Sequence, residues 1–132
     1  VYEAYKKSGP NVLGVEALQG DDGCTGVKVN TADGYADYLF SATDMQAHHP
    51  SKRVSFCGGL GLIREKEGQI QLMYLGCGRS LKKGNFVLES DHDVYAAIYM
   101  QHGVWYYSAT GPVRVKIGKE TKELNEGYNQ KL

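Results

Sequence analysis

The stretch FVLESDHDVYAAIYMQHGVWYYSATG, residues 86–111, decides the fold class. It holds three short segments rich in Val, Ile, Tyr and Phe, separated by the acidic turn DHD and by the dipeptide His-Gly. β-Branched and aromatic residues between turn residues are typical of successive strands. The stretch therefore predicts two adjacent antiparallel hairpins.

The same pattern extends in both directions from this stretch. Seventeen glycines and only three prolines separate further apolar segments, among them GVKVN, YADYLFSA, RVSFCGGLGLIRE and QIQLMYLGC. EKEG, residues 65–68, predicts a hairpin turn, and the glycines of CGGLG predict a bulge or a sharp bend. TDMQAHHPSK and GRSLKKGN are predicted loops, and the chain from Lys119 onward predicts a short helix or a frayed end.

Such strand spacing fits an antiparallel barrel or sandwich. We expect an all-β, single domain over residues 1–132: an antiparallel up-and-down barrel of about eight strands with a short C-terminal helix or tail.

Charge and apolar content restrict the classes of function. Fifteen basic residues balance fifteen acidic ones, which argues against nucleic-acid binding. No apolar run approaches the roughly 20 residues of a membrane helix, so no membrane insertion is expected. The chain opens on VYEAYKKSG, without an apolar signal segment, which fits a cytosolic protein or a mature secreted one.

Metal binding and catalysis find little support in the residue pattern. Cys24, Cys57 and Cys77 form no CxxC pair and have no ordered histidine spacing, so no metal and no cofactor are expected. A Cys57–Cys77 disulfide across a hairpin is geometrically feasible, with Cys24 unpaired or paired otherwise. His48 and His49 favour a solvated loop, and no GxSxG motif occurs. We therefore expect no catalytic residues and no enzyme.

The aromatic residues of VWYYSATG lie on both faces of their strand. Trp105 and Tyr107 share one face, while Val104 and Tyr106 share the other. Two interpretations stay open: plain core packing, or a barrel wall whose inner face lines a cavity for one small molecule.

FVLESDHDVYAAIYM resembles a lipocalin pattern in which a strand ends in Thr-Asp-Tyr-Asp and the next begins Tyr-Ala. Ser90, Asp91, His92 and Asp93 stand at the tetrad, and Tyr95 and Ala96 follow. VWYYSATGP, the opening VYEAYKKSG and CTGVKVNTADGYADYLFSA are similar to further lipocalin strands, most of all to those of secreted arthropod lipocalins. The resemblance implies a secreted protein with a barrel that transports or sequesters a small hydrophobic or amphipathic ligand.

Lumen positions carried over from this resemblance, together with strand alternation, give the expected ligand-binding residues: Tyr35, Tyr38, Ile70, Leu72, Tyr74, Ile98, Met100, Trp105 and Tyr107. An amine ligand would need an acidic partner, for which Asp37, Asp44 and Glu89 are the candidates.

Two other functions remain open at this stage. One is a protein-binding β module, of the inhibitor or immune-recognition type, that acts through TDMQAHHPSK and GRSLKKGN. The other is an enzyme with Cys57 or Cys24 as nucleophile. A homodimer through exposed aromatic residues is also compatible with the sequence.

Overall fold

The computed structural model describes residues 11–18 and 23–132, and within them it contains strands but no helix. The strands are β1 (Val12–Leu18), β2 (Cys24–Thr31), β3 (Tyr35–Ala42), β4 (His48–Ser51), β5 (Val54–Lys66), β6 (Gln69–Lys83), β7 (Phe86–Gln101), β8 (Val104–Ala109), β9 (Val113–Ile117), β10 (Glu120–Leu124) and β11 (Gly127–Lys131). The all-β prediction is confirmed. The strand expected at VYEAY lies outside the described residues. In the part that is described, no helix is long and apolar enough to cross a membrane.

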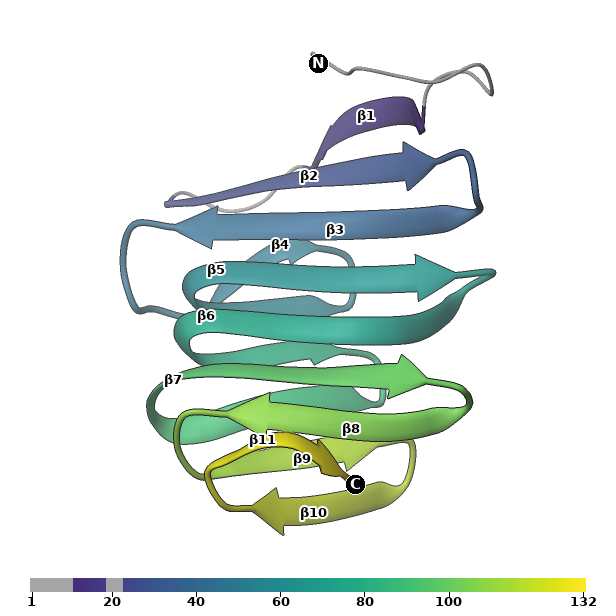
Figure 1. The fold of residues 1–132 in the computed structure, drawn as a ribbon. Coiled ribbons are helices and arrows are strands. Elements are labelled where there is room, and N and C mark those ends of the chain that lie inside the picture. The colour runs from purple at the N-terminus through teal and green to yellow at the C-terminus, as the bar shows by residue number, and fades with distance from the viewer. Residues whose placement is uncertain (1–10, 19–22) are drawn as a thin grey trace.

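The strands form one antiparallel sheet that does not close. Its main path runs β1-β2-β3-β5-β6-β7-β8-β11, with β4 paired to β5 and the β9–β10 hairpin joined to β7. β1 and β11 stand at opposite ends of this path (Figure 1). The predicted up-and-down barrel is therefore wrong: the sheet of the described strands has open edges, at β1, β11, β4 and β10, and does not close on itself.

Three long strands double the sheet over on itself. β5, β6 and β7 have 13, 15 and 16 residues, and each is interrupted near its middle by a shift in register. At the bend the chains approach very closely, since a Cβ on Gly78 would lie 2.8 Å from Cα of Gly58. The predicted bulge at CGGLG is thus confirmed, and it folds the sheet into two layers instead of curling it into a barrel (Figure 1).

The core lies between these two layers. In one layer a row of directly paired, buried residues crosses four strands: Ile63, Met73, Ile98 and Tyr107. The other layer supplies a second such row: Phe56, Leu81, Leu88 and Val115. Both rows belong to one cluster of buried apolar side chains, as expected for a two-layer β architecture.

Two of the tight turns follow directly from local sequence. Glu67 and Gly68 have φ of 52° and 77°, and His102 and Gly103 have φ of 52° and 78°. Two successive residues with positive φ match the twist of the strands that a two-residue hairpin joins. The turns predicted at EKEG and at His-Gly are therefore confirmed.

Four local predictions were wrong because tertiary pairing prevailed over local sequence. Within the predicted solvated loop TDMQAHHPSK, residues 48–51 form β4, which pairs with β5, and His48 is buried. The acidic residues of DHD do not end a strand but form a bulge inside β7. The basic segment predicted as a loop belongs mostly to β6. The predicted C-terminal helix or tail is instead β10 and β11, because Gly118, with φ of 64°, turns the chain back onto β9 and β11 pairs with β8.

Candidate functional site: a tyrosine groove on the outer sheet face

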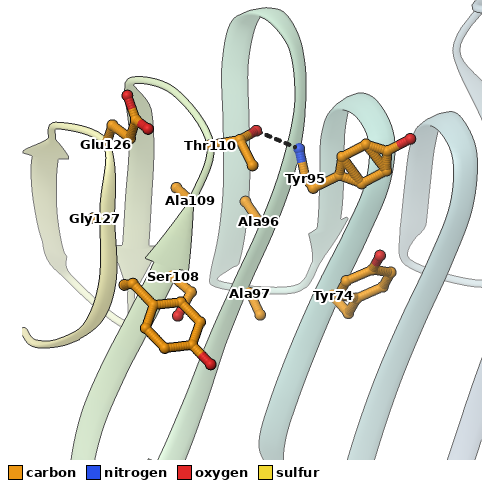
Figure 2. A pocket seen from close by; sticks show the side chains of 10 residues that line it. Tyr74, Tyr95, Ala96, Ala97, Ser108, Ala109, Thr110, Glu126 and Gly127 are labelled. Carbon is orange, nitrogen blue, oxygen red and sulfur yellow. Dashed lines mark hydrogen bonds between the residues drawn. The ribbon is translucent and has the colours of Figure 1, made fainter.

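A groove of about 610 Å³ lies on the face of the larger layer that points away from the core. It crosses β6, β7, β8 and the start of β11 (Figure 2). Its lining residues are Tyr74, Tyr95, Ala96, Ala97, Ser108, Ala109, Thr110, Glu126, Gly127 and Tyr128. Large aromatic side chains thus stand around a floor of small residues.

The floor is low because the directly paired residues on β7 and β8 have small side chains. Ala97 pairs with Tyr74 on one side and with Ser108 on the other. The Ser108 hydroxyl is turned toward β11, where it accepts a hydrogen bond of 2.9 Å from the Asn129 backbone N–H. Adjacent positions on one sheet face are about 5 Å apart, so an alanine and a serine beside a tyrosine leave a hollow.

Tyr74 lies along β6, with its ring above Gly76. A Cβ built on Gly76 would meet the ring at 3.1 Å and the Tyr74 hydroxyl at 3.3 Å. It would also lie 3.2 Å from Cβ of Leu60. The missing side chain at Gly76 therefore lets the tyrosine ring lie against the sheet, where it presents a flat surface to the groove.

Tyr95 stands on the opposite side of the groove from the β11 rim and is 52% exposed. Its backbone is fixed to Thr110 twice: the Tyr95 N–H donates to the Thr110 hydroxyl at 3.0 Å (Figure 2). In return the Thr110 N–H donates to the Tyr95 carbonyl, also at 3.0 Å. An exposed aromatic ring on a fixed backbone is a contact surface that loses little backbone entropy on binding.

Tyr107 fixes the β11 rim of the groove from the core side of the sheet. This core residue donates a hydrogen bond from its hydroxyl to the Asn125 carbonyl at 3.1 Å. Gly127 packs against the same hydroxyl, since a Cβ there would lie 3.0 Å from it. The buried phenol thus fixes the segment that carries Glu126 and Tyr128, and Tyr128 is 77% exposed.

The groove is polar through hydroxyl groups more than through charge. Among its described lining residues only Glu126 carries a full charge, whereas tyrosine, serine and threonine supply hydroxyls. Flat aromatic faces with a few hydroxyls around them suit a ligand that has both apolar faces and hydroxyl groups.

The structure distributes the nine predicted ligand-binding residues over several environments. Tyr74 alone lines the groove. Ile70, Ile98 and Tyr107 are buried in the core, against which Tyr38 and Trp105 also pack. Ile70 and Leu72 were predicted to share a face, but they do not. β6 bulges between these two residues, where the pairing with β5 shifts between Arg64 and Glu65.

The remaining predicted residues lie away from the groove. Tyr35 has Arg64 and Lys66 over its ring, at 4.7 and 4.9 Å, and half-buried Met100 pairs with Trp105. Strand alternation places Leu72 on the outer face with Tyr74. Sequence reasoning missed Tyr95, Glu126 and Tyr128. The sequence did carry a signal for Tyr95: it stands out of phase with the apolar Ala96 and Ile98, which indicates that it lies on the opposite, outer face of the strand.

The acidic candidates for an amine ligand are occupied by other side chains. Asp37 accepts two hydrogen bonds from Arg64, at 2.7 and 2.8 Å. Asp44 contacts His48 at 2.7 Å, and this hydrogen bond lowers the pKa of the carboxyl. Burial acts to raise the pKa of Glu89, but hydrogen bonds from Arg114 and Lys82 outweigh it and the pKa is lowered.

Cys57 and Cys77, for which a disulfide was considered feasible from the sequence, are both free thiols. Cys57 donates a hydrogen bond to the Met45 carbonyl at 3.1 Å, and burial raises the pKa of its thiol. A raised pKa lowers the thiolate fraction and disfavours a nucleophilic role. Among the described residues no group of three or more His, Cys, Asp or Glu side chains could hold a metal ion.

Fold and groove together define an antiparallel two-layer β module with an aromatic groove on an outer sheet face. Residues 12–100 match the family described as the endo-acting ulvan lyase C-terminal domain, and the chain belongs to that family. Searches of curated proteins and of solved structures found no match.

This membership corrects the family and the functions expected from sequence. The matching family is not the lipocalins, and the open sheet lacks the lumen that a lipocalin carrier needs. Transport of a small hydrophobic or amine ligand was therefore a wrong prediction. The protein-binding alternative finds no support in the family match either.

Proposed function

We propose that this chain is a non-catalytic glycan-binding module that holds ulvan, the polysaccharide in the name of its family, in the groove formed by Tyr74, Tyr95 and Tyr128. The observation that carries the proposal is three tyrosines around a floor of small residues on an open sheet face. A pyranose ring has a C–H-rich face that packs on an aromatic ring and an edge of hydroxyls. The surrounding Ser108, Thr110 and tyrosine hydroxyls offer partners for that edge.

The groove suits binding better than chemistry. Proton abstraction and leaving-group protonation require a positioned base and acid within hydrogen-bond reach of the reacting atoms. Apart from its tyrosines, the described groove residues include one carboxylate, Glu126, and no histidine, lysine or arginine that could pair with a tyrosine as base or acid. We therefore assign bond cleavage to a lyase domain that this module assists, and we place both outside the cell, where a polymeric substrate is accessible.

The openness of the groove also favours a polymer. A closed cavity would accept a free small molecule, whereas a groove across four strands lets a chain enter and leave at both ends. Multiple weak stacking contacts along such a chain give binding that is reversible at each site, which suits a module that keeps a lyase near its substrate.

Affinity electrophoresis in gels containing ulvan tests the proposal. The unmodified chain should be retarded in proportion to ulvan concentration and not by dextran. Tyr74→Ala, Tyr95→Ala and Tyr128→Ala should each weaken binding about five- to tenfold, the effect of losing about 1–1.4 kcal/mol. Tyr35→Ala, a change of the same kind outside the groove, is the matched control.

Two results would overturn the proposal. One is the absence of retardation of the folded, unmodified chain by ulvan. The other is equal weakening by Tyr35→Ala and by the groove variants, because binding would then depend on the overall surface and not on the groove. Thermal unfolding of each variant separates lost binding from lost structure.

A further inference from the structure

A second, chemically different pocket lies where three turns meet, and it shares no residue with the tyrosine groove. It has a volume of about 360 Å³ and lies between the β4–β5, β5–β6 and β6–β7 turns. The side chains that give it its character are Arg53, Glu65, Gln69, Lys83, Asn85 and Phe86.

Lys83, which lines the pocket, shares one aromatic ring with a second lysine. Lys83 and Lys28 lie over the ring of Tyr38, with their Nζ atoms 4.0 and 5.5 Å from its centroid. Lys83 is also ion-paired with Glu65, which is only 9% exposed. Glu65 is the one carboxylate among the described residues that line the pocket.

Arg53 is placed at the mouth of the pocket by the local backbone. It adopts a positive φ of 65°, and its carbonyl accepts a hydrogen bond of 3.3 Å from the Gly84 N–H. Its guanidinium crosses directly over Gly84, where a Cβ would lie 2.9 Å from Nη2. Gly84 itself has a positive φ of 58°, which favours glycine, and its missing side chain leaves room for the guanidinium above it.

The cations outnumber the anions available to them. Within residues 11–18 and 23–132, neither Arg53 nor Lys28 forms an ion pair with a carboxylate. Burial, and next the charges of Lys28 and Arg53, lower the pKa of Lys83. Arg53 and Lys83 line the pocket with one carboxylate, and the charge of Lys28 also acts on Lys83. The three cations repel one another in a partly buried place, and a second anion would relieve that repulsion.

We propose that this pocket binds an oxyanion, a carboxylate or sulfate group, between Arg53 and Lys83. The guanidinium presents paired N–H donors that match the oxygens of either group. The amides of Gln69 and Asn85 add neutral donors beside it. The ligand is either a free ion or the acidic group of a saccharide, and both present the same oxygens.

Titrations of the ¹⁵N-labelled chain with sodium sulfate, sodium glucuronate and glucose test the pocket. Sodium chloride keeps the ionic strength constant, and the Arg53 Nε–H and Asn85 amide signals are followed. Sulfate or glucuronate should shift these signals to saturation, and uncharged glucose should not. Saturation by glucuronate alone assigns the pocket to a saccharide acid, whereas saturation by sulfate shows that a free oxyanion suffices.

Arg53→Gln removes the exposed charge and keeps the buried Lys83–Glu65 pair, so this variant should fold. It should weaken binding at least fivefold. Lys52→Gln, which removes the same charge from the adjacent exposed residue of the same turn, should leave binding unchanged. Shifts that stay linear to high concentration, or equal weakening by both variants, would refute the pocket and indicate nonspecific screening.

The pocket and the groove can fail separately. Tyr74→Ala should not change oxyanion binding, and Arg53→Gln should not change any retardation by ulvan that rests on the tyrosine rings. Loss of oxyanion binding in a folded Tyr74→Ala variant would contradict the separation of the two sites.

Discussion

Gly76→Ala is the sharpest test of the groove, because it leaves every tyrosine in place. The new Cβ would lie 3.1 Å from Cε1 of Tyr74 and 3.2 Å from Cβ of Leu60. Contacts this short require the ring to lift by a few tenths of an ångström. Its face would then tilt away from the plane in which a sugar ring packs.

The size of the effect follows from the area that stacking removes from water. Covering roughly 50 Å² of a tyrosine face at about 25 cal/mol per Å² contributes about 1.2 kcal/mol, which corresponds to about an eightfold change in Kd. The fold should tolerate the change, because an alanine in a strand gains roughly 0.5–1 kcal/mol over glycine, which offsets part of the crowding.

Affinity electrophoresis with ulvan and urea unfolding measure the two quantities in parallel. Gly76→Ala should bind about fivefold to tenfold more weakly and unfold within about 1 kcal/mol of the unmodified chain. Gly14→Ala is the matched control, because a Cβ there meets no atom within 4 Å. Unchanged affinity in a folded Gly76→Ala variant would refute the assignment of Tyr74 as a flat binding surface.

Three further predictions concern the core, acid stability and thiol reactivity. Ile98→Ala, at a fully buried position of the core, should lower the free energy of unfolding by about 2–5 kcal/mol in urea titrations, and a loss below 1 kcal/mol would contradict the two-layer packing. The hydrogen bond to His48 lowers the pKa of Asp44 below 3.8, so the stability from this pair is present above pH 3.8 and is lost as the pH falls through the folded-state pKa. The difference in urea midpoint between the unmodified chain and Asp44→Asn should therefore shrink below pH 3.8, and a constant difference would be contrary evidence. Iodoacetamide should label exposed Cys77 faster than Cys57, whose pKa burial raises, and mass spectrometry of the labelled peptides would reveal the reverse order.

The fold class and several turns could be predicted because they depend on local signals. Alternating apolar residues and the dipeptides Glu67-Gly68 and His102-Gly103 specify strands and two-residue hairpins whatever the rest of the chain does. The bulge at CGGLG was equally local, since paired glycines rarely serve another purpose inside a strand.

The layer arrangement could not be predicted, because it depends on where distant chains pack. The polar segment Ser90–Asp93 looks like a turn, yet β7 continues through it and bends. Whether a bent sheet then closes or doubles over depends on contacts between the two core rows. Phe56 belongs to one row and Ile63 to the other, and they lie on the two halves of the same strand, β5.

The candidate site was missed for a related reason. Of the two interpretations of the aromatic residues on both faces of β8, core packing holds for Tyr107, which faces the core, while Tyr106 stacks with Tyr99 at 6.0 Å on the open face. A one-residue bulge before Leu72 also moves the side chains that follow it in β6 to the opposite face from the one that strand alternation from Ile70 predicts.

The three bent strands also determine how this protein comes apart. Because β5, β6 and β7 each run through both layers, neither layer is a separate stretch of chain that can detach while the other persists. Opening the molecule requires breaking all three strands at their bends together. We therefore expect amide protons of both layers to exchange through one global event with a common free energy, and partial forms that retain the groove without the oxyanion pocket should be scarce.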